Sequence, residues 1–287
     1  MQPTVVRVDP ERLELLRERI LSEGKATTVR PASGYEAFRF RYQDEHIVAY
    51  RSGKIVSSGP RSAAVVAQAV RGLAMQDADP GIVIGSDEAG KGEWLGPLVV
   101  AAVALTPEQS AHLQAIGVMD SKEVPLSKIP HLARDILETC IAHQTVLIPP
   151  ATFNERLTEM RAEGKNLNDL LAWAHARAIS DLISSLPKSQ FEGLRVVIDE
   201  FARGKTQSRL RRVVDLKRVT VVQKPHAEDV IAVAAASIVA REAREAWIDR
   251  AGARLGIDLR ELTVTDVSRR KDCSSLAKAE YVSKMTE

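Results

Sequence analysis

The chain has 287 residues, of which 45% are hydrophobic, 27% are charged and 4% are aromatic, so its cores must be built from aliphatic side chains and alanine. Cys140 and Cys273 lie far apart and outside any zinc-binding spacing, and no apolar run is long enough to span a membrane. With a formal net charge of only +2, bulk charge does not attract nucleic acid, so a nucleic-acid-binding protein would need its basic residues on one face.

The first 78 residues are expected to form a small α+β domain. Asp9 precedes apolar residues at helical spacing, which predicts a capped helix, and the next segment switches to an alternation with period two, which predicts antiparallel strands. The expected elements are a helix over 10–22, strands over 35–42, 46–51 and 54–58, and a helix over 62–75. A short polar stretch that ends in Pro80 is expected to separate this domain from a second one over 80–287.

The alternation along residues 35–42 decides which side chains of this segment face solvent. Phe38 and Phe40 point to one side of the strand, and Arg39 and Arg41 point to the other. Aromatic side chains are the usual core set, so we expect the two arginines to line the exposed face of the sheet.

The remainder of the chain alternates strands and helices, which predicts a mixed α/β domain around a central sheet. The expected strands cover 81–84, 96–105, 194–198 and 219–222, and the expected helices cover 126–139, 150–161, 168–186 and 232–249. His175 lies in the middle of one of these helices, where a packing role is more ordinary than that of a general base.

Two apolar strands of this domain run directly into acidic residues. Asp87 and Glu88 follow the first strand and precede a glycine-rich stretch, and Asp199 follows another. A carboxylate at the end of a buried strand is costly unless it is paired or metal-bound, and open α/β sheets build their sites at this edge. The pattern therefore favours a cation site beside a polyanion, although a solvated turn for the first acids and a helix cap for Asp199 remain alternatives.

A third acidic pair, Glu228 and Asp229, precedes the small-residue run 232–237. Acids at a helix start are often only partners of the helix dipole. The small side chains, however, require the helix to pack very close to something, and the sheet that carries the other acids is the natural candidate. Clustered carboxylates without cysteine favour Mg²⁺ or Mn²⁺, and two such ions about 3.5–4 Å apart can promote phosphodiester hydrolysis.

Three motifs in this order resemble the signatures of the type 2 ribonuclease H family. The run D-E-A-G-K-G at 87–92, followed by Gly96-Pro97, resembles the D-E-x-G-x-G…G-P signature, 120–122 resembles the D-S-K segment, and 234–240 resembles the A-A-A-S-I-x-A helix. The stretch 166–176, N-L-N-D-L-L-A-W-A-H-A, and the extra N-terminal domain favour the ribonuclease HIII branch over HII.

The resemblance implies a ribonuclease H-like mixed central sheet flanked by helices, preceded by a small α+β domain that resembles the TATA-binding protein and binds the substrate. It implies an endoribonuclease that hydrolyses the RNA strand of RNA–DNA hybrids. From the sparse, unpaired cysteines and the lack of a membrane-length apolar run, the protein is expected to be cytoplasmic and without membrane contact, and it is expected to be monomeric. Two Mg²⁺ or Mn²⁺ ions per site would leave 5′-phosphate and 3′-hydroxyl ends. The alternatives are excision of single ribonucleotides as in ribonuclease HII, and an inactive hybrid-binding module.

The resemblance also assigns roles to individual residues. The metal-binding and catalytic set is Asp87, Glu88, Asp199 and Glu228, with Asp229 as the alternative fourth acid. The substrate-binding set is Gly90, Lys91 and Gly92, which read ribose and phosphate, Lys122 at phosphate, and Arg39, Arg41 and Lys54 on the N-terminal sheet. Glu200 departs from the family, which usually has glutamine there, and its role stays open.

Overall fold

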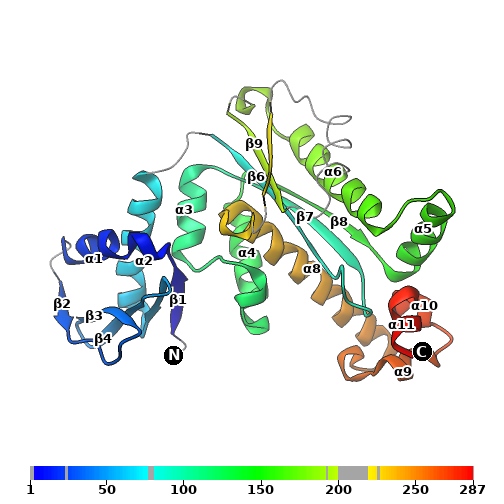
Figure 1. Cartoon of the computed structure of the whole chain (residues 1–287), viewed down its shortest axis with the longest axis horizontal. Helices are drawn as coiled ribbons and strands as arrows, with labels where there is room; N and C mark the ends of the chain where they lie inside the picture. Colours follow the sequence, from blue (N-terminus) through cyan, green and yellow to red (C-terminus); the bar gives the residue numbers. More distant parts are fainter. Residues whose placement is uncertain are drawn as a thin grey trace. The chain divides into compact units, whose positions relative to one another are not determined.

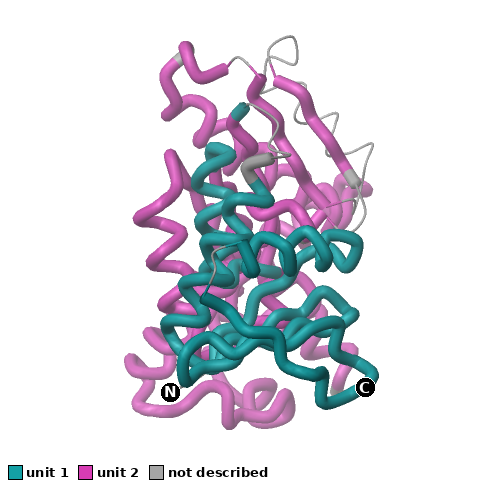
Figure 2. Tube along the Cα trace, turned by 90° about the vertical axis from the view of Figure 1, so that its left-hand side faces the viewer, with its two compact units in different colours: residues 1–81, 105–119 teal, residues 82–104, 120–287 magenta. Residues whose placement is uncertain are grey.

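The computed structural model describes residues 3–22, 25–76, 81–191, 193–199, 219–224 and 227–286. The chain divides into two compact units, the first made of residues 1–81 and 105–119 and the second of residues 82–104 and 120–287 (Figure 2). Within the described ranges, no helix is both long enough and apolar enough to cross a membrane.

The first unit is built on a five-stranded sheet with the order β1-β5-β4-β3-β2, in which all neighbouring strands are antiparallel (Figure 1). Its strands are β1 (Thr4–Arg7), β2 (Ala26–Val29), β3 (Glu36–Tyr42), β4 (Glu45–Tyr50) and β5 (Lys54–Ser57). The predicted meander is confirmed as β3, β4 and β5. The two flanking strands, β1 and β2, were not predicted, because neither sequence alternates clearly between apolar and polar residues.

Helices α1 (Leu13–Ser22), α2 (Pro60–Gln76) and α3 (Pro107–Ala115) complete the first unit. The predicted cap is confirmed at the 3-10 turn Pro10–Arg12 that leads into α1, since the Asp9 side chain accepts a hydrogen bond from the Glu11 backbone N–H at 3.0 Å. Leu16 and Ile20 of α1 are buried with Phe38 and Phe40 of β3 in one core. The face of β3 that carries Arg39 and Arg41 is therefore the face opposite this core, as predicted.

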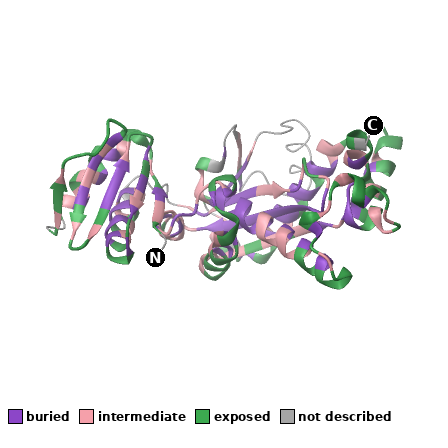
Figure 3. Cartoon of the chain, turned by 90° about the horizontal axis from the view of Figure 1, so that it is seen from below, coloured by how far each residue is buried: buried purple, intermediate pink, exposed green. Residues whose placement is uncertain are grey.

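The second unit contains a mixed sheet with the order β10-β9-β6-β7-β8. Its strands are β6 (Val83–Ala89), β7 (Leu98–Leu105), β8 (Ala142–Ile148), β9 (Arg195–Asp199) and β10 (Thr220–Lys224). Strand β9 pairs in parallel with both β6 and β10, whereas β8 pairs antiparallel with β7. Every residue of β7 is buried, and Figure 3 shows that the inner strands form the buried interior of the unit.

Helices cover both faces of this sheet. The described helices are α4 (Ile129–Thr139), α5 (Pro150–Ala162), α6 (Leu167–Ser185), α8 (Ile231–Leu255), α9 (Val264–Ser268), α10 (Cys273–Leu276) and α11 (Ala279–Thr286). Side chains alternate along β6, so Ile84 joins the core beneath α6 while Gly85 contacts α8 on the other face. The two acids at the end of β6, Asp87 and Glu88, follow the same alternation and therefore face opposite sides of the sheet.

Candidate active site

The parallel pairing of β6 and β9 brings two of the predicted acids together. Ser86 of β6 is in register with Ile198 of β9, and the next residue on each strand is Asp87 and Asp199. Neighbouring strands lie about 4.8 Å apart, so these two positions are adjacent at the carboxyl edge of the sheet. The expectation that two strands deliver acids to one edge is confirmed.

Helix α8 lies against β6 at backbone contact distance. A Cβ atom added at Gly85 would stand 2.1 Å from the carbonyl carbon of Ala232 and 2.2 Å from the nitrogen of Val233. No residue other than glycine fits at this point, and the small residues of α8 allow the approach from the other side. The prediction that the small-residue helix packs on the sheet carrying the acids is therefore confirmed.

Asp87 lies on the α8 face of the sheet and is partly buried. Burial and, to a smaller extent, the neighbouring charge of Glu88 raise the pKa of its carboxyl group to about 6, against the opposing effect of a hydrogen bond with Ser237. The Ser237 hydroxyl is also 2.7 Å from the Ser121 hydroxyl, so the D-S-K segment and Asp87 are joined through one side chain of α8. The negative charge of Asp87 is thus only weakly compensated within the protein.

Glu88 points to the other face of the sheet, and its side chain is 12% exposed. Its Oε2 lies 3.1 Å from Nε2 of the buried His175, and its Oε1 lies 3.3 Å from Nζ of Lys91. Burial opposes ionisation, but these two partners lower the pKa of Glu88 to about 2. The two acids that are adjacent in sequence therefore have opposite electrostatic environments.

His175 is more than the packing residue that its sequence position indicates. The Ser86 hydroxyl donates its one proton to the carbonyl of Ala101 at 2.8 Å, so its oxygen accepts from Nδ1 of His175, also at 2.8 Å. The other ring nitrogen, Nε2, lies 3.1 Å from Oε2 of Glu88. The ring thus fixes the orientation of Glu88, a contact between residues 87 positions apart that no sequence spacing indicates.

The loop between β6 and β7, residues 90–97, is called the glycine loop below. Gly90 has a φ of +85°, and an added Cβ would stand 2.3 Å from the Pro97 carbonyl oxygen, so this position requires glycine. At Gly92 an added Cβ would meet nothing within 4 Å, which marks an open side of the loop. Lys91 contacts Glu88, whereas Lys122, 85% exposed, extends into solvent with Asp120 at 4.0 Å.

The fourth acid lies at the edge of the described structure. The backbone of Glu228 belongs to a 3-10 turn, Ala227–Asp229, and the N–H of Ala227 is 3.5 Å from Oδ1 of Asp199. The side chain of Glu228 and the whole of Glu200 lie outside the described residues, and Asp229 is exposed. Among the side chains that are described, no group of three or more His, Cys, Asp or Glu is placed to hold a metal ion.

The predicted basic residues of the first unit share the open face of its sheet. Arg39 makes a bidentate ion pair with the buried Glu36, in which Nε lies 3.0 Å from Oε2 and Nη2 lies 2.8 Å from Oε1. The charge of Arg39 is therefore compensated locally. Arg41 is exposed and stands opposite His46, and the exposed Lys54 stands opposite Arg7.

Comparison with known proteins first defines the class. A family model described as Ribonuclease HII matches residues 84–270, which contain the strand-end acids, the glycine loop and helix α8. The match therefore places the chain in the class of type 2 ribonucleases H.

Relatives and solved structures then define the branch. Ribonuclease HIII of Protochlamydia amoebophila is 35% identical, covering 85% of this chain and 79% of the relative, and ribonuclease HIII of Chlamydia muridarum is 32% identical, covering 84% and 79%. The structure of Bst-RNase HIII in complex with Mn²⁺ matches with a TM-score of 0.61 and 26% identity, over 100% of this chain and 99% of that chain. The chain belongs to the type 2 ribonuclease H family, in its ribonuclease HIII branch. The predicted family and fold class are both confirmed.

Proposed function

We propose that this ribonuclease is an endonuclease that hydrolyses the RNA strand of RNA–DNA hybrids with the help of divalent cations held at the carboxyl edge of the second unit's sheet. The observation that carries the proposal is the register of β6 and β9, which sets Asp87 beside Asp199 directly before the glycine loop. The first unit serves as the hybrid-binding domain and the second as the catalytic domain.

The residues at this edge suit a hard divalent cation. Their donor atoms are carboxylate oxygens, and the raised pKa of Asp87 reflects a buried negative charge that a cation would compensate. Asp87, Glu88, Asp199 and Glu228 would hold Mg²⁺ or Mn²⁺, two ions per site. When bound, such ions increase the acidity of a water molecule and stabilise charge on the leaving oxygen of the phosphodiester.

The remaining residues bind and orient the substrate and the acids. His175 and Lys91 hold Glu88 in one orientation, and Ser237 does the same for Asp87. Backbone N–H groups of the glycine loop face the 2′-hydroxyl groups that distinguish RNA from DNA. Lys91 contacts Glu88, Lys122 follows Ser121 of the D-S-K segment, and both neutralise phosphate charge.

The open face of the first unit's sheet contributes contacts to the phosphate backbone. Arg41 and Lys54 are the stronger candidates, because both are exposed. Arg39 contributes less, since its guanidinium group is already paired with Glu36. Such contacts release counterions, so their loss weakens binding and flattens its dependence on salt without changing the chemical step.

The test is cleavage of a labelled RNA–DNA hybrid by the wild type and by Asp87→Asn, with Mg²⁺, with Mn²⁺ and with chelator. A companion duplex carries a single ribonucleotide in DNA. Metal-dependent cutting of the hybrid by the wild type alone supports the site, and poor cutting of the companion supports the ribonuclease HIII activity. Efficient excision from the companion would support the ribonuclease HII activity instead. Binding without cutting under either metal would leave only a hybrid-binding module.

A further inference from the structure

The glycine loop is paired along its length with a segment near the C-terminus. The N–H of Gly96 donates to the Leu276 carbonyl at 2.9 Å, Leu95 forms an antiparallel bridge with Ala277, and the N–H of Lys278 donates to the Trp94 carbonyl at 2.8 Å. We call residues 276–281 the C-terminal clamp. It consists of the end of α10, the residues that connect it to α11, and the first turn of α11.

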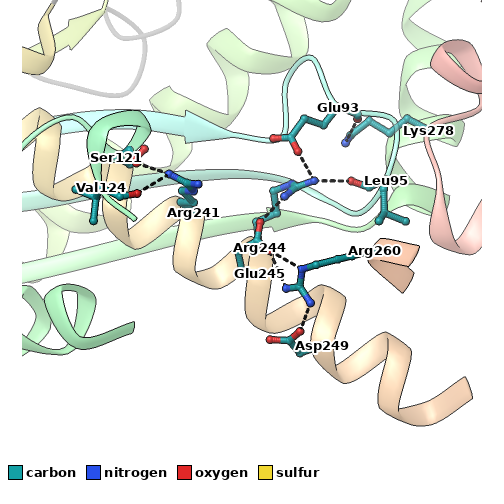
Figure 4. Close-up of polar contacts among 10 residues, drawn as sticks. All are labelled: Glu93, Leu95, Ser121, Val124, Arg241, Arg244, Glu245, Asp249, Arg260 and Lys278. Carbon is teal, nitrogen blue, oxygen red and sulfur yellow. Dashed lines mark hydrogen bonds and ion pairs between the residues drawn. The ribbon is translucent and has the colours of Figure 1, made fainter. Parts of the chain in front are cut away.

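Two side chains of the clamp reach further into the loop. The Tyr281 hydroxyl donates to the Lys91 carbonyl at 2.5 Å, and Nζ of Lys278 donates to the Glu93 carbonyl at 2.7 Å. Figure 4 shows Lys278 approaching Glu93 from one side while Arg244 of α8 contacts both Glu93 and Leu95. The carbonyl groups of residues 91, 93, 94 and 95 are therefore all engaged by protein donors.

The burial of Lys278 indicates that this arrangement does not serve stability alone. Its side chain is fully buried, with Nζ 5.6 Å from the centre of the Phe153 ring. Burial and the nearby charge of Arg244 lower the pKa of Lys278 to about 7, which shows that its charge is disfavoured there. A buried cation is costly, so an apolar residue would hold the segment in place at less cost.

The direction of one peptide group follows from the Tyr281 contact. The carbonyl of a trans peptide and the N–H of the next residue point in opposite directions, and no described peptide bond is cis. Because the Lys91 carbonyl points at Tyr281, the N–H of Gly92 points away from it. Glycine tolerates both signs of φ, so this peptide plane could otherwise rotate at low cost.

We propose that Tyr281 is a positioning residue that holds the Lys91–Gly92 peptide with its N–H facing the ribose of the bound strand, and so sets the preference for RNA over DNA. Lys278 supports it by fixing the next part of the loop. A 2′-hydroxyl accepts a hydrogen bond from such an N–H, and deoxyribose offers no group in that place. The inference rests on the proposed hybrid-cleaving function and adds the residue that orients its ribose contact.

The clamp is itself anchored on α5, which makes it a fixed support. Nδ2 of Asn154 donates to the Ala277 carbonyl at 3.0 Å, while its Oδ1 accepts from the N–H of Ala279 at 2.8 Å. Arg161 adds an ion pair with Glu280 at 2.6 Å. Removing only the Tyr281 hydroxyl should therefore leave the clamp in place and free the single peptide that it holds.

The test is Tyr281→Phe in the full chain, with Ser283→Ala as the matched control. Ser283 lies on the same helix, and its hydroxyl donates to the Ala279 carbonyl rather than to the loop. Fluorescence anisotropy in chelator measures Kd for an RNA–DNA hybrid and for a DNA duplex of the same sequence. Steady-state cleavage gives KM and kcat, and thermal unfolding reports the fold.

For Tyr281→Phe we expect Kd and KM for the hybrid to rise about 3- to 10-fold, the scale of one lost hydrogen bond. Binding of the DNA duplex, kcat and Tm should stay at wild-type values, and Ser283→Ala should match the wild type throughout. Unchanged hybrid binding would overturn the positioning role. Equal weakening of hybrid and duplex with a lower Tm would overturn it too, because that is the result of a structural brace. If the wild type neither binds nor cuts the hybrid, the proposed function on which this inference rests would be overturned instead.

Discussion

Replacing Asp87 by Asn should make the metal-free protein more stable while removing its activity. Burial raises the pKa of Asp87 from 3.8 to about 6, so the ionised side chain favours the unfolded chain above that pH. The full difference between these two pKa values corresponds to about 3 kcal/mol in the free energy of unfolding. Because the side chain keeps some contact with water, we expect the variant to gain about 1–3 kcal/mol. Asparagine has nearly the same shape and carries no charge, so it removes this penalty.

The sign of the pH dependence follows from the raised pKa. Below pH 3.8 Asp87 is protonated in both the folded and the unfolded chain and carries no penalty. Between pH 3.8 and the folded pKa of about 6 the unfolded chain releases this proton while the folded chain keeps it, so the folded chain loses stability as the pH rises, and the loss is complete above about pH 6. The advantage of Asp87→Asn should thus be complete at pH 7.5 and much smaller at pH 4.5.

Thermal unfolding in chelator at these two pH values measures the effect, with Asp135→Asn as a control. Asp135 is an exposed carboxylate of the same unit, on α4. We expect the Tm of Asp87→Asn to exceed that of the wild type by about 3–10 °C at pH 7.5. Added Mn²⁺ should raise the Tm of the wild type and leave that of the variant unchanged. A variant less stable than the wild type at pH 7.5, or a gap that is the same at both pH values, would refute the reasoning.

Three further outcomes follow from the geometry. Gly85→Ala should lower stability by about 3 kcal/mol or more, because its Cβ collides with backbone atoms of α8, whereas Gly92→Ala should leave Tm unchanged. Arg41→Ala should reduce the slope of log Kd for the hybrid against log salt by about 1, and Arg39→Ala by clearly less, as measured by anisotropy. His175→Leu should weaken Mn²⁺ binding about 10- to 100-fold, measured by calorimetry, because it releases the carboxylate that the ring orients.

Short sequence patterns predicted which side chains of a strand face the core and which strands end in acidic residues. The alternation in β3 placed Phe38 and Phe40 in the core and Arg39 and Arg41 outside it, because successive side chains of a strand must face opposite ways. Acids at two strand ends were predicted to meet because parallel strands share one carboxyl edge, and the pairing of β6 with β9 confirms this. Strands β1, β2 and β8 were missed because none of their sequences alternates clearly between apolar and polar residues.

Long-range contacts were not predictable in the same way. Helix α3 joins the first unit although the chain reaches it only after β7 of the second, and nothing in a nine-residue segment indicates which core it will meet. His175 and Lys278 look like an ordinary core histidine and an ordinary surface lysine. His175 owes its role to Glu88, 87 positions away, and Lys278 owes its role to Glu93, 185 positions away.

One face of α8 explains how these distant pieces are held at a common site. Ser237, Arg241 and Arg244 are spaced by four and three residues, so they lie along a single side of the helix. Ser237 bonds to Asp87 and to Ser121. Figure 4 shows that Arg241 contacts the carbonyls of Ser121 and Val124 and that Arg244 contacts the glycine loop. The acid, the D-S-K segment and the loop are therefore fixed relative to one another by a single rigid element. That element touches the strand bearing the acid at Gly85 without any intervening side chain, so a change in its position would move all three together.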